Sequence, residues 1–167
     1  MIFRGTFEHA LDAKHRLTVP SKFRAALSGG VVLAASHEVS PGSPRSVSIW
    51  TPDGYEAFTA QTLNGLNPSS PRARELKRFF FNASFDAELD SANRLMIPPT
   101  LMRYATLDKE VIVTGSGECI EVWDRKSYDE YFVSRNPWLP RRRLICSSGC
   151  SDDAHSLGVL RGHYRFR

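Results

Sequence analysis

The sequence has few cysteines and no long apolar run. Its 167 residues include three cysteines, Cys119, Cys146 and Cys150, too few for the dense disulfide framework of a small secreted domain. No stretch approaches the roughly 18 consecutive apolar residues that a transmembrane helix needs. The N-terminus reaches Arg4 and Glu8 with no apolar core between them, so we expect no signal peptide. These absences predict a cytoplasmic protein with no membrane partner.

Signatures of catalysis are also scarce. Ser116 lacks the surroundings of a nucleophile elbow, and Gly115-x-Gly117 is too short for a dinucleotide-binding loop. Four possible zinc ligands occur near the end of the chain: Cys146, Cys150, His155 and His163. The two histidines are eight residues apart, wider than the usual spacing, so we expect no metal. The sequence predicts no enzyme, no cofactor and no small-molecule substrate.

Charge is spread unevenly along the chain. Residues 1–133 carry 15 Lys and Arg against 16 Asp and Glu, whereas residues 134–167 carry seven Arg against two Asp. The body therefore has a net charge of −1, and the tail makes the whole chain basic. The overall charge of +4 is weak evidence for nucleic-acid binding by the body. Evidence for binding must come from where individual charges lie.

The most informative feature is an internal repeat. Residues 7–20 and 85–98 align at an offset of 78, with six of fourteen positions identical. The match continues with gaps: 31–33 resembles 111–113, 48–50 resembles 121–123, and Tyr55 and Phe58 resemble Tyr128 and Tyr131. Two copies indicate a duplication rather than a solenoid.

Each copy predicts the same series of elements. In copy one, alternation and turn residues predict strands at 7–11 and 17–19 that form a hairpin, a helix at 21–27, strands at 31–34 and 47–50, and a helix at 52–63. In copy two they predict strands at 85–89, 95–97, 111–114 and 119–123, with helices at 99–105 and 125–133. A further helix at 72–81 links the copies.

These elements predict a mainly β fold with short helices, of the α+β class. We expect a first repeat at 5–52, a helical connector at 53–82, a second repeat at 83–126, the end of a helix at 127–133, and a basic tail at 134–167. The tail matches neither repeat, and its composition predicts disorder.

Both copies carry an Asp-x-x-x-Arg-Leu motif followed by proline, at Asp12–Arg16 and Asp90–Arg94. Together with the opening residues 1–9 and the stretch 107–111, these motifs resemble the MraZ family over about residues 1–133. The resemblance implies two tandem AbrB-like swapped-hairpin β units that form one pseudo-symmetric barrel. It also implies a ring-shaped, nucleoid-associated homo-oligomer that binds promoter DNA and regulates the division and cell-wall gene cluster.

The resemblance places the DNA contacts on the two motifs. The residues concerned are Asp12, Lys14, His15, Arg16, Asp90, Asn93 and Arg94. A two-stranded ribbon can enter the major groove, where an arginine donates two parallel bonds to guanine. Asp would hold the arginine in place, and Lys14 would contact phosphate. Because Ala92 stands where copy one has Lys14, we expect copy one to contact DNA more strongly.

One position departs from the family pattern. The family usually has glycine just before the motif arginine, whereas this chain has His15 and Asn93. Glycine there indicates a backbone with positive φ. Asn and His are among the other residues that tolerate that conformation, so we expect both turns to be kept.

Simpler interpretations compete with these predictions. Each Asp-x-x-x-Arg could be an ion pair that only stabilises its turn. The aromatic residues at equivalent sites are expected to pack in a core or an interface: Trp50, Trp123, Tyr55 and Tyr128. A solvated surface is favoured over a DNA patch for the basic helix residues Arg72, Arg74, Lys77 and Arg78, and Cys119 is expected to be buried. For the whole chain, the alternatives are an AbrB-like antitoxin or protein-binding module and a small enzyme of unknown chemistry.

Overall fold

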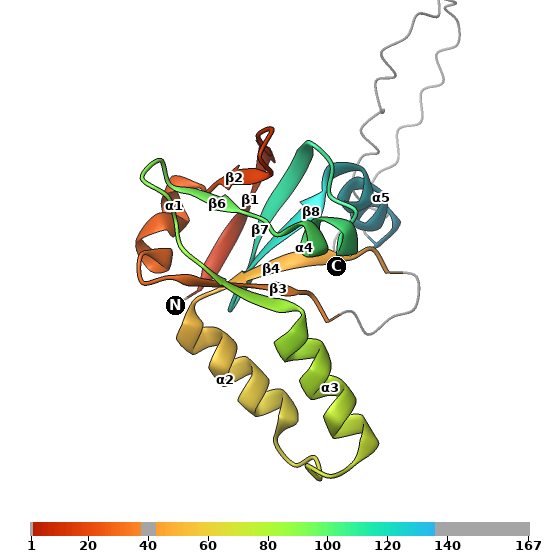
Figure 1. Ribbon diagram of the computed structural model, residues 1–167. Helices are drawn as coiled ribbons and strands as arrows, with labels where there is room; N and C mark the ends of the chain where they lie inside the picture. The colour runs from red at the N-terminus through yellow and green to blue at the C-terminus, as the bar shows by residue number, and fades with distance from the viewer. Residues whose placement is uncertain (1, 38–42, 136–167) are drawn as a thin grey trace, which may run out of the picture.

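The computed structural model describes residues 2–37 and 43–135 (Figure 1). Copy one forms β1 (Phe3–Ala10), β2 (Arg16–Thr18), α1 (Ser21–Arg24), the 3-10 turn η1 (Ala25–Leu27), β3 (Val31–Ala35), β4 (Ser46–Trp50) and α2 (Pro52–Leu63). Copy two forms β5 (Ser84–Ala87), β6 (Arg94–Met96), α4 (Pro99–Tyr104), β7 (Glu110–Gly117), β8 (Ile120–Asp124) and α5 (Arg125–Arg135). Helix α3 (Pro71–Asn82) lies between the copies. The predicted mainly β fold with short helices is confirmed.

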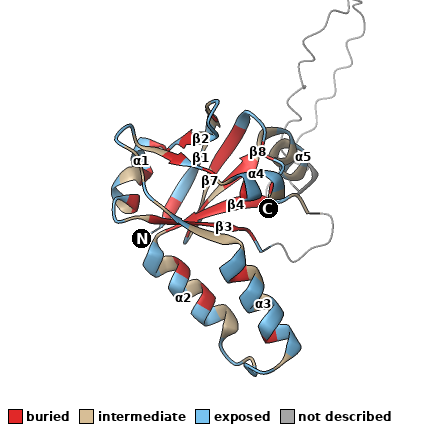
Figure 2. Cartoon of the chain, viewed as in Figure 1, coloured by how far each residue is buried: buried red, intermediate tan, exposed pale blue. Residues whose placement is uncertain are grey.

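The two long helices begin where the sequence supplies a cap. Thr51 accepts a hydrogen bond from the backbone N–H of Gly54 at the start of α2, and Ser70 accepts one from that of Ala73 at the start of α3. Proline occupies the first turn of both helices, where its missing N–H costs nothing. The α2–α3 pair projects from the body of the molecule and is largely exposed (Figure 2).

Strands are exchanged between the two copies. The main sheet has the antiparallel order β1-β7-β8-β4-β3-β5, and a second sheet consists of β2 and β6. The equivalent strands of the two copies are β1 and β5, β3 and β7, and β4 and β8. Exchanging each strand for its equivalent gives the same order read from the other end of the sheet. The chain is therefore built around a pseudo-twofold axis, as two tandem swapped units require.

The hairpin predicted within copy one is wrong. A single bridge joins Leu11, the residue after β1, to Leu17 of β2, whereas β1 pairs along its full length with β7 and β2 pairs with β6. Alternation of apolar residues indicates which face of a strand is buried but not which strand is its partner. The eight residues of β1 find a partner of equal length in β7, whereas β2 has only three residues.

The pseudo-twofold axis passes through the core. Leu17 and Leu95 lie opposite each other in the β2–β6 ladder, and neither is exposed to solvent. They belong to one cluster with residues from both copies, including Val47, Ile49, Ile120 and Val122. Barrel closure stays a prediction, because β1 and β5 stand at the two ends of the described sheet.

The tail predicted for residues 134–167 lies, except for its first two residues, outside the described residues. Within the described ranges, every helix is too short or too polar to span a lipid bilayer.

Candidate functional site

The β2–β6 ribbon has one buried face and one exposed face. Arg16 pairs with Met96, Leu17 with Leu95, and Thr18 with Arg94. Because successive side chains on a strand point to opposite faces, the two leucines point into the core and the other four side chains point outward. The structure thus brings both motif arginines onto one small surface.

The turns that precede the two strands share one geometry. The Oδ1 atom of Asp12 accepts the backbone N–H of Lys14 at 2.8 Å and that of Arg16 at 3.0 Å. In copy two, Oδ1 of Asp90 accepts the corresponding N–H groups of Ala92 and Arg94, both at 2.9 Å. Each aspartate therefore holds its own turn through two backbone bonds, as turn-starting aspartates do.

The predicted backbone conformation at the glycine position is confirmed. His15 has a φ of 56° and Asn93 a φ of 57°. Both values lie in the left-handed region, which favours glycine but which Asn and His also adopt. Both turns are therefore kept without the glycine. His15 is exposed at the end of its turn, whereas Asn93 is half-buried.

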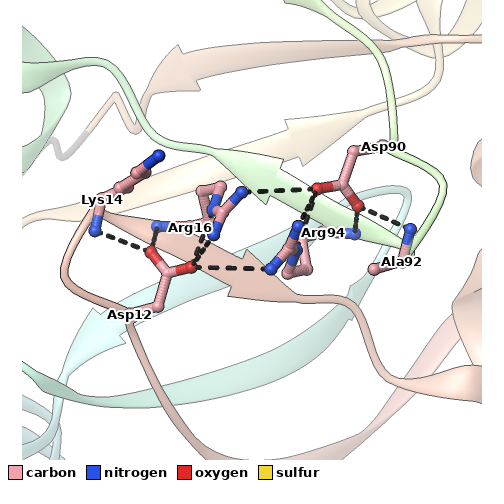
Figure 3. Close-up of polar contacts among 6 residues, drawn as sticks. All are labelled: Asp12, Lys14, Arg16, Asp90, Ala92 and Arg94. Carbon is pink, nitrogen blue, oxygen red and sulfur yellow. Dashed lines mark hydrogen bonds and ion pairs between the residues drawn. The ribbon is translucent and has the colours of Figure 1, made fainter.

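The four motif side chains form one group of charges, called here the ion quartet: Asp12, Arg16, Asp90 and Arg94 (Figure 3). Within copy one, Nε and Nη2 of Arg16 each lie 2.7 Å from Oδ2 of Asp12. Within copy two, the corresponding distances between Arg94 and Asp90 are 2.9 and 2.8 Å.

Two longer ion pairs join the copies. Nη1 of Arg16 lies 3.8 Å from Oδ2 of Asp90, and Nη1 of Arg94 lies 4.0 Å from Oδ2 of Asp12. All four side chains remain partly exposed, between 26% and 35%. The quartet therefore carries no net charge and is open to solvent on one side.

Hydrogen bonding within the quartet favours the charged carboxylates. The side-chain hydrogen bond from Arg16, helped by its backbone N–H, lowers the pKa of Asp12 to about 2. The equivalent bond from Arg94 lowers the pKa of Asp90. Both carboxylates therefore stay ionised at neutral pH, and the arginines stay held.

These lowered pKa values make the quartet sensitive to acid. A carboxylate with a folded-state pKa below its unfolded value, near 3.9, adds stability above that value and loses it as the pH falls toward 2. We expect the melting temperature of the wild-type protein to fall more steeply between pH 4 and pH 2 than that of Asp12→Asn/Asp90→Asn. Circular-dichroism melts of both proteins would measure this, because all other carboxylates contribute equally to both. If the melting temperatures of the two proteins fall equally between pH 4 and pH 2, the expectation is contradicted.

Two outward-facing residues of the ribbon were missed by the sequence analysis. Thr18 is exposed and Met96 is 63% exposed, and they lie across the ladder from Arg94 and Arg16. Alternation along 16–18 and 94–96 would have placed them beside the arginines, had the pairing of β2 with β6 been known. Lys14 is also exposed, whereas copy two has the neutral Ala92 at this position.

The other predicted residues lie away from the ribbon. The aromatic residues pack as predicted: Trp50 stacks on Phe58 at a centroid distance of 4.7 Å, and Trp123 on Tyr131 at 5.6 Å. Cys119 is buried, which raises its pKa to about 12 and makes it a poor nucleophile. The four basic side chains of α3 are exposed, as a solvated surface requires: Arg72, Arg74, Lys77 and Arg78.

No group of three or more potential metal ligands occurs in the part of the chain that the structure describes. The four cysteine and histidine residues considered as zinc ligands lie outside it.

The fold and the ion quartet define a class: a duplicated, strand-exchanged β protein whose two motif turns meet on one exposed ribbon. A family model described as "MraZ protein, putative antitoxin-like" matches twice, over residues 2–79 and 80–137. The chain belongs to the MraZ family.

Individual relatives agree with this assignment. Proteins named "Transcriptional regulator MraZ" from Mesoplasma florum, Herpetosiphon aurantiacus and Dictyoglomus thermophilum are 36%, 34% and 32% identical over 131, 127 and 135 residues. The matches cover 78%, 76% and 81% of this chain and 86%, 84% and 88% of the relatives.

Proposed function

We propose that this protein is a transcriptional regulator that binds specific sites in promoter DNA through the exposed face of the β2–β6 ribbon. The relatives named above are transcriptional regulators by name. The observation that carries the DNA-binding site is the ion quartet, in which two arginines from distant parts of the chain converge on one exposed surface. Ion pairs that are partly exposed contribute only modestly to stability, so the arrangement is compatible with a second role in binding.

The quartet keeps its arginines ready for an acceptor from DNA. Each guanidinium is already oriented by two bonds to a carboxylate, so little side-chain entropy is lost on binding. Arg16 and Arg94 can exchange part of these contacts for a guanine edge or a phosphate, both of which accept two parallel bonds. In this proposal Asp12 and Asp90 are positioning residues.

The ends of the turns supply the remaining contacts. Lys14 and His15 are exposed beside the quartet in copy one, and Asn93 takes the position of His15 in copy two. Lys14 would contact a phosphate, which adds affinity without sequence preference. His15 and Asn93 can each donate to or accept from DNA. Copy one therefore makes the stronger contact.

Affinity requires more than one subunit. A ribbon with three residues in each strand spans only a few base pairs, and residues 1–133 carry a net charge of −1. Several ribbons that engage repeated sites together would raise affinity without new contacts. We therefore propose a ring-like homo-oligomer. From the family resemblance, we propose that it acts in the cytoplasm, on the nucleoid, at the promoter of the division and cell-wall gene cluster.

The direct test measures binding to the DNA upstream of this protein's own gene. We expect the full chain to bind that duplex at least a hundredfold more tightly than a shuffled duplex of equal length and composition. Fluorescence anisotropy would measure the affinity, and light scattering on the same sample should give a mass above that of a dimer. Equal affinity for both duplexes, or a monomer at micromolar concentration, would contradict the proposal.

A second candidate is an antitoxin-like protein-binding module, favoured by the description of the family model. A footprint on the promoter separates the two functions, since a protein-binding module would leave none.

A further inference from the structure

The exposed face of the ribbon carries one large apolar side chain, Met96, directly across the ladder from Arg16. Four large apolar residues are exposed in the described part of the chain: Ile2, Phe81, Met96 and Phe132. Met96 alone of these lies on the ribbon, where it is 63% exposed and directly across the ladder from Arg16. Its strand neighbour Leu95 fills the core, so Met96 has no role in the packing of that core.

The pseudo-twofold axis relates the two halves of this face, but the residues beside the two arginines differ. The counterpart of Met96 in copy one is Thr18, which lies across the ladder from Arg94. One arginine therefore has a long apolar neighbour, and the other has a short polar neighbour. Two residues directly opposite each other in an antiparallel pair have Cβ atoms about 5 Å apart. This distance corresponds to one or two base-pair steps along DNA, at about 3.4 Å each.

The major groove offers one apolar group to such a side chain. It is the C5 methyl of thymine, whereas guanine presents two acceptors that suit arginine. Removing an exposed methionine from water by contact with that methyl is favourable, because both apolar surfaces are desolvated.

We propose that Met96 contacts the C5 methyl of a thymine within two base steps of the base bound by Arg16. Met96 is then a specificity-determining residue in the half of the site bound by Arg16. This inference rests on the proposed DNA-binding function.

The test compares two duplexes that differ only in methyl groups. One is the DNA upstream of this protein's own gene, and the other is the same duplex with every thymine replaced by deoxyuridine. Base pairing and all other groups in the groove stay the same. One methyl contact contributes about fourfold in affinity, so wild-type protein should bind the deoxyuridine duplex about fourfold more weakly per contacted thymine.

The affinity of Met96→Ala is measured for the same two duplexes. This variant should bind the thymine duplex about tenfold more weakly than wild type, and its ratio between the two duplexes should fall toward one. Phe81→Ala is the matched control, because Phe81 is also a large apolar residue, 59% exposed, but lies on α3 and not on the ribbon. It should leave both affinities unchanged.

Each other outcome overturns a distinct statement. If Met96→Ala keeps the wild-type ratio between the duplexes, Met96 does not contact the methyl. If it lowers the mass measured by light scattering and leaves the ratio unchanged, Met96 contacts a second copy of the chain instead. If wild-type protein binds neither duplex, the proposed DNA-binding function itself is wrong, and this inference with it.

Discussion

Arg16→Ala is expected to weaken binding to the promoter duplex by about fivefold to 140-fold. Loss of a bidentate contact with a base costs about 1–3 kcal/mol in specific binding. The turn itself should persist, because the backbone N–H groups of residues 14 and 16 still donate to Asp12. Affinity measured by anisotropy and melting temperature measured on the same sample would test both statements.

Two further variants separate base contacts from phosphate contacts. Arg94→Ala should also weaken specific binding, but less than Arg16→Ala, because copy two lacks a lysine beside its arginine. Lys14→Ala should weaken binding to all sequences alike and reduce the salt dependence by about one unit. A large fall in melting temperature for Arg16→Ala, with the affinity of the folded protein unchanged, would make the quartet purely structural.

Leu17→Ala is expected to reduce the free energy of unfolding by about 2–5 kcal/mol. Leu17 is fully buried and lies on the pseudo-twofold axis against Leu95, where both copies meet. Such a substitution loses the burial of the removed atoms and leaves a cavity that the neighbours fill only in part. Urea denaturation at one fixed protein concentration would measure the change, since the stability of an oligomer depends on concentration.

The adjacent residue provides the comparison for that experiment. Thr18 is in the same strand but exposed, so Thr18→Ala should change the free energy of unfolding by about 0.5 kcal/mol or less. Leu95→Ala should resemble Leu17→Ala, because the axis makes their surroundings equivalent. Similar values for Leu17→Ala and Thr18→Ala would show that the ribbon is not packed on the core as described.

Local features of the fold were predictable from the sequence. Turn residues, alternation and capping signals act over a few neighbouring positions, and they placed seven of the eight described strands and the longer helices within about three residues of their observed bounds. The exception is β1, which was predicted at 7–11 and begins at Phe3. The left-handed backbone at His15 and Asn93 was predicted from the family resemblance, because the family usually has glycine at that position. The duplication made these predictions firmer, since each copy supports the other.

The partners of the strands were not predictable by the same means. β1 and β2 are adjacent in sequence and alternate as a hairpin would, but each pairs with a strand from the other copy. The two copies have similar strands, so pairing within a copy and pairing between copies satisfy the same local pattern. The cross-copy ion pairs of the quartet follow from that pairing, and so could not be seen before it was known.

Strand exchange also affects how the chain folds while it is being synthesised. Residues 3–10 of β1 pair with residues 117–110 of β7, so the partner leaves the ribosome more than a hundred residues later for most positions. At about 5–20 residues per second, this interval is roughly 5–20 seconds. The nascent N-terminal strand keeps an unpaired edge for that time, and the first copy cannot complete its sheet before the second is made. Folding of the first copy therefore waits for synthesis of the second.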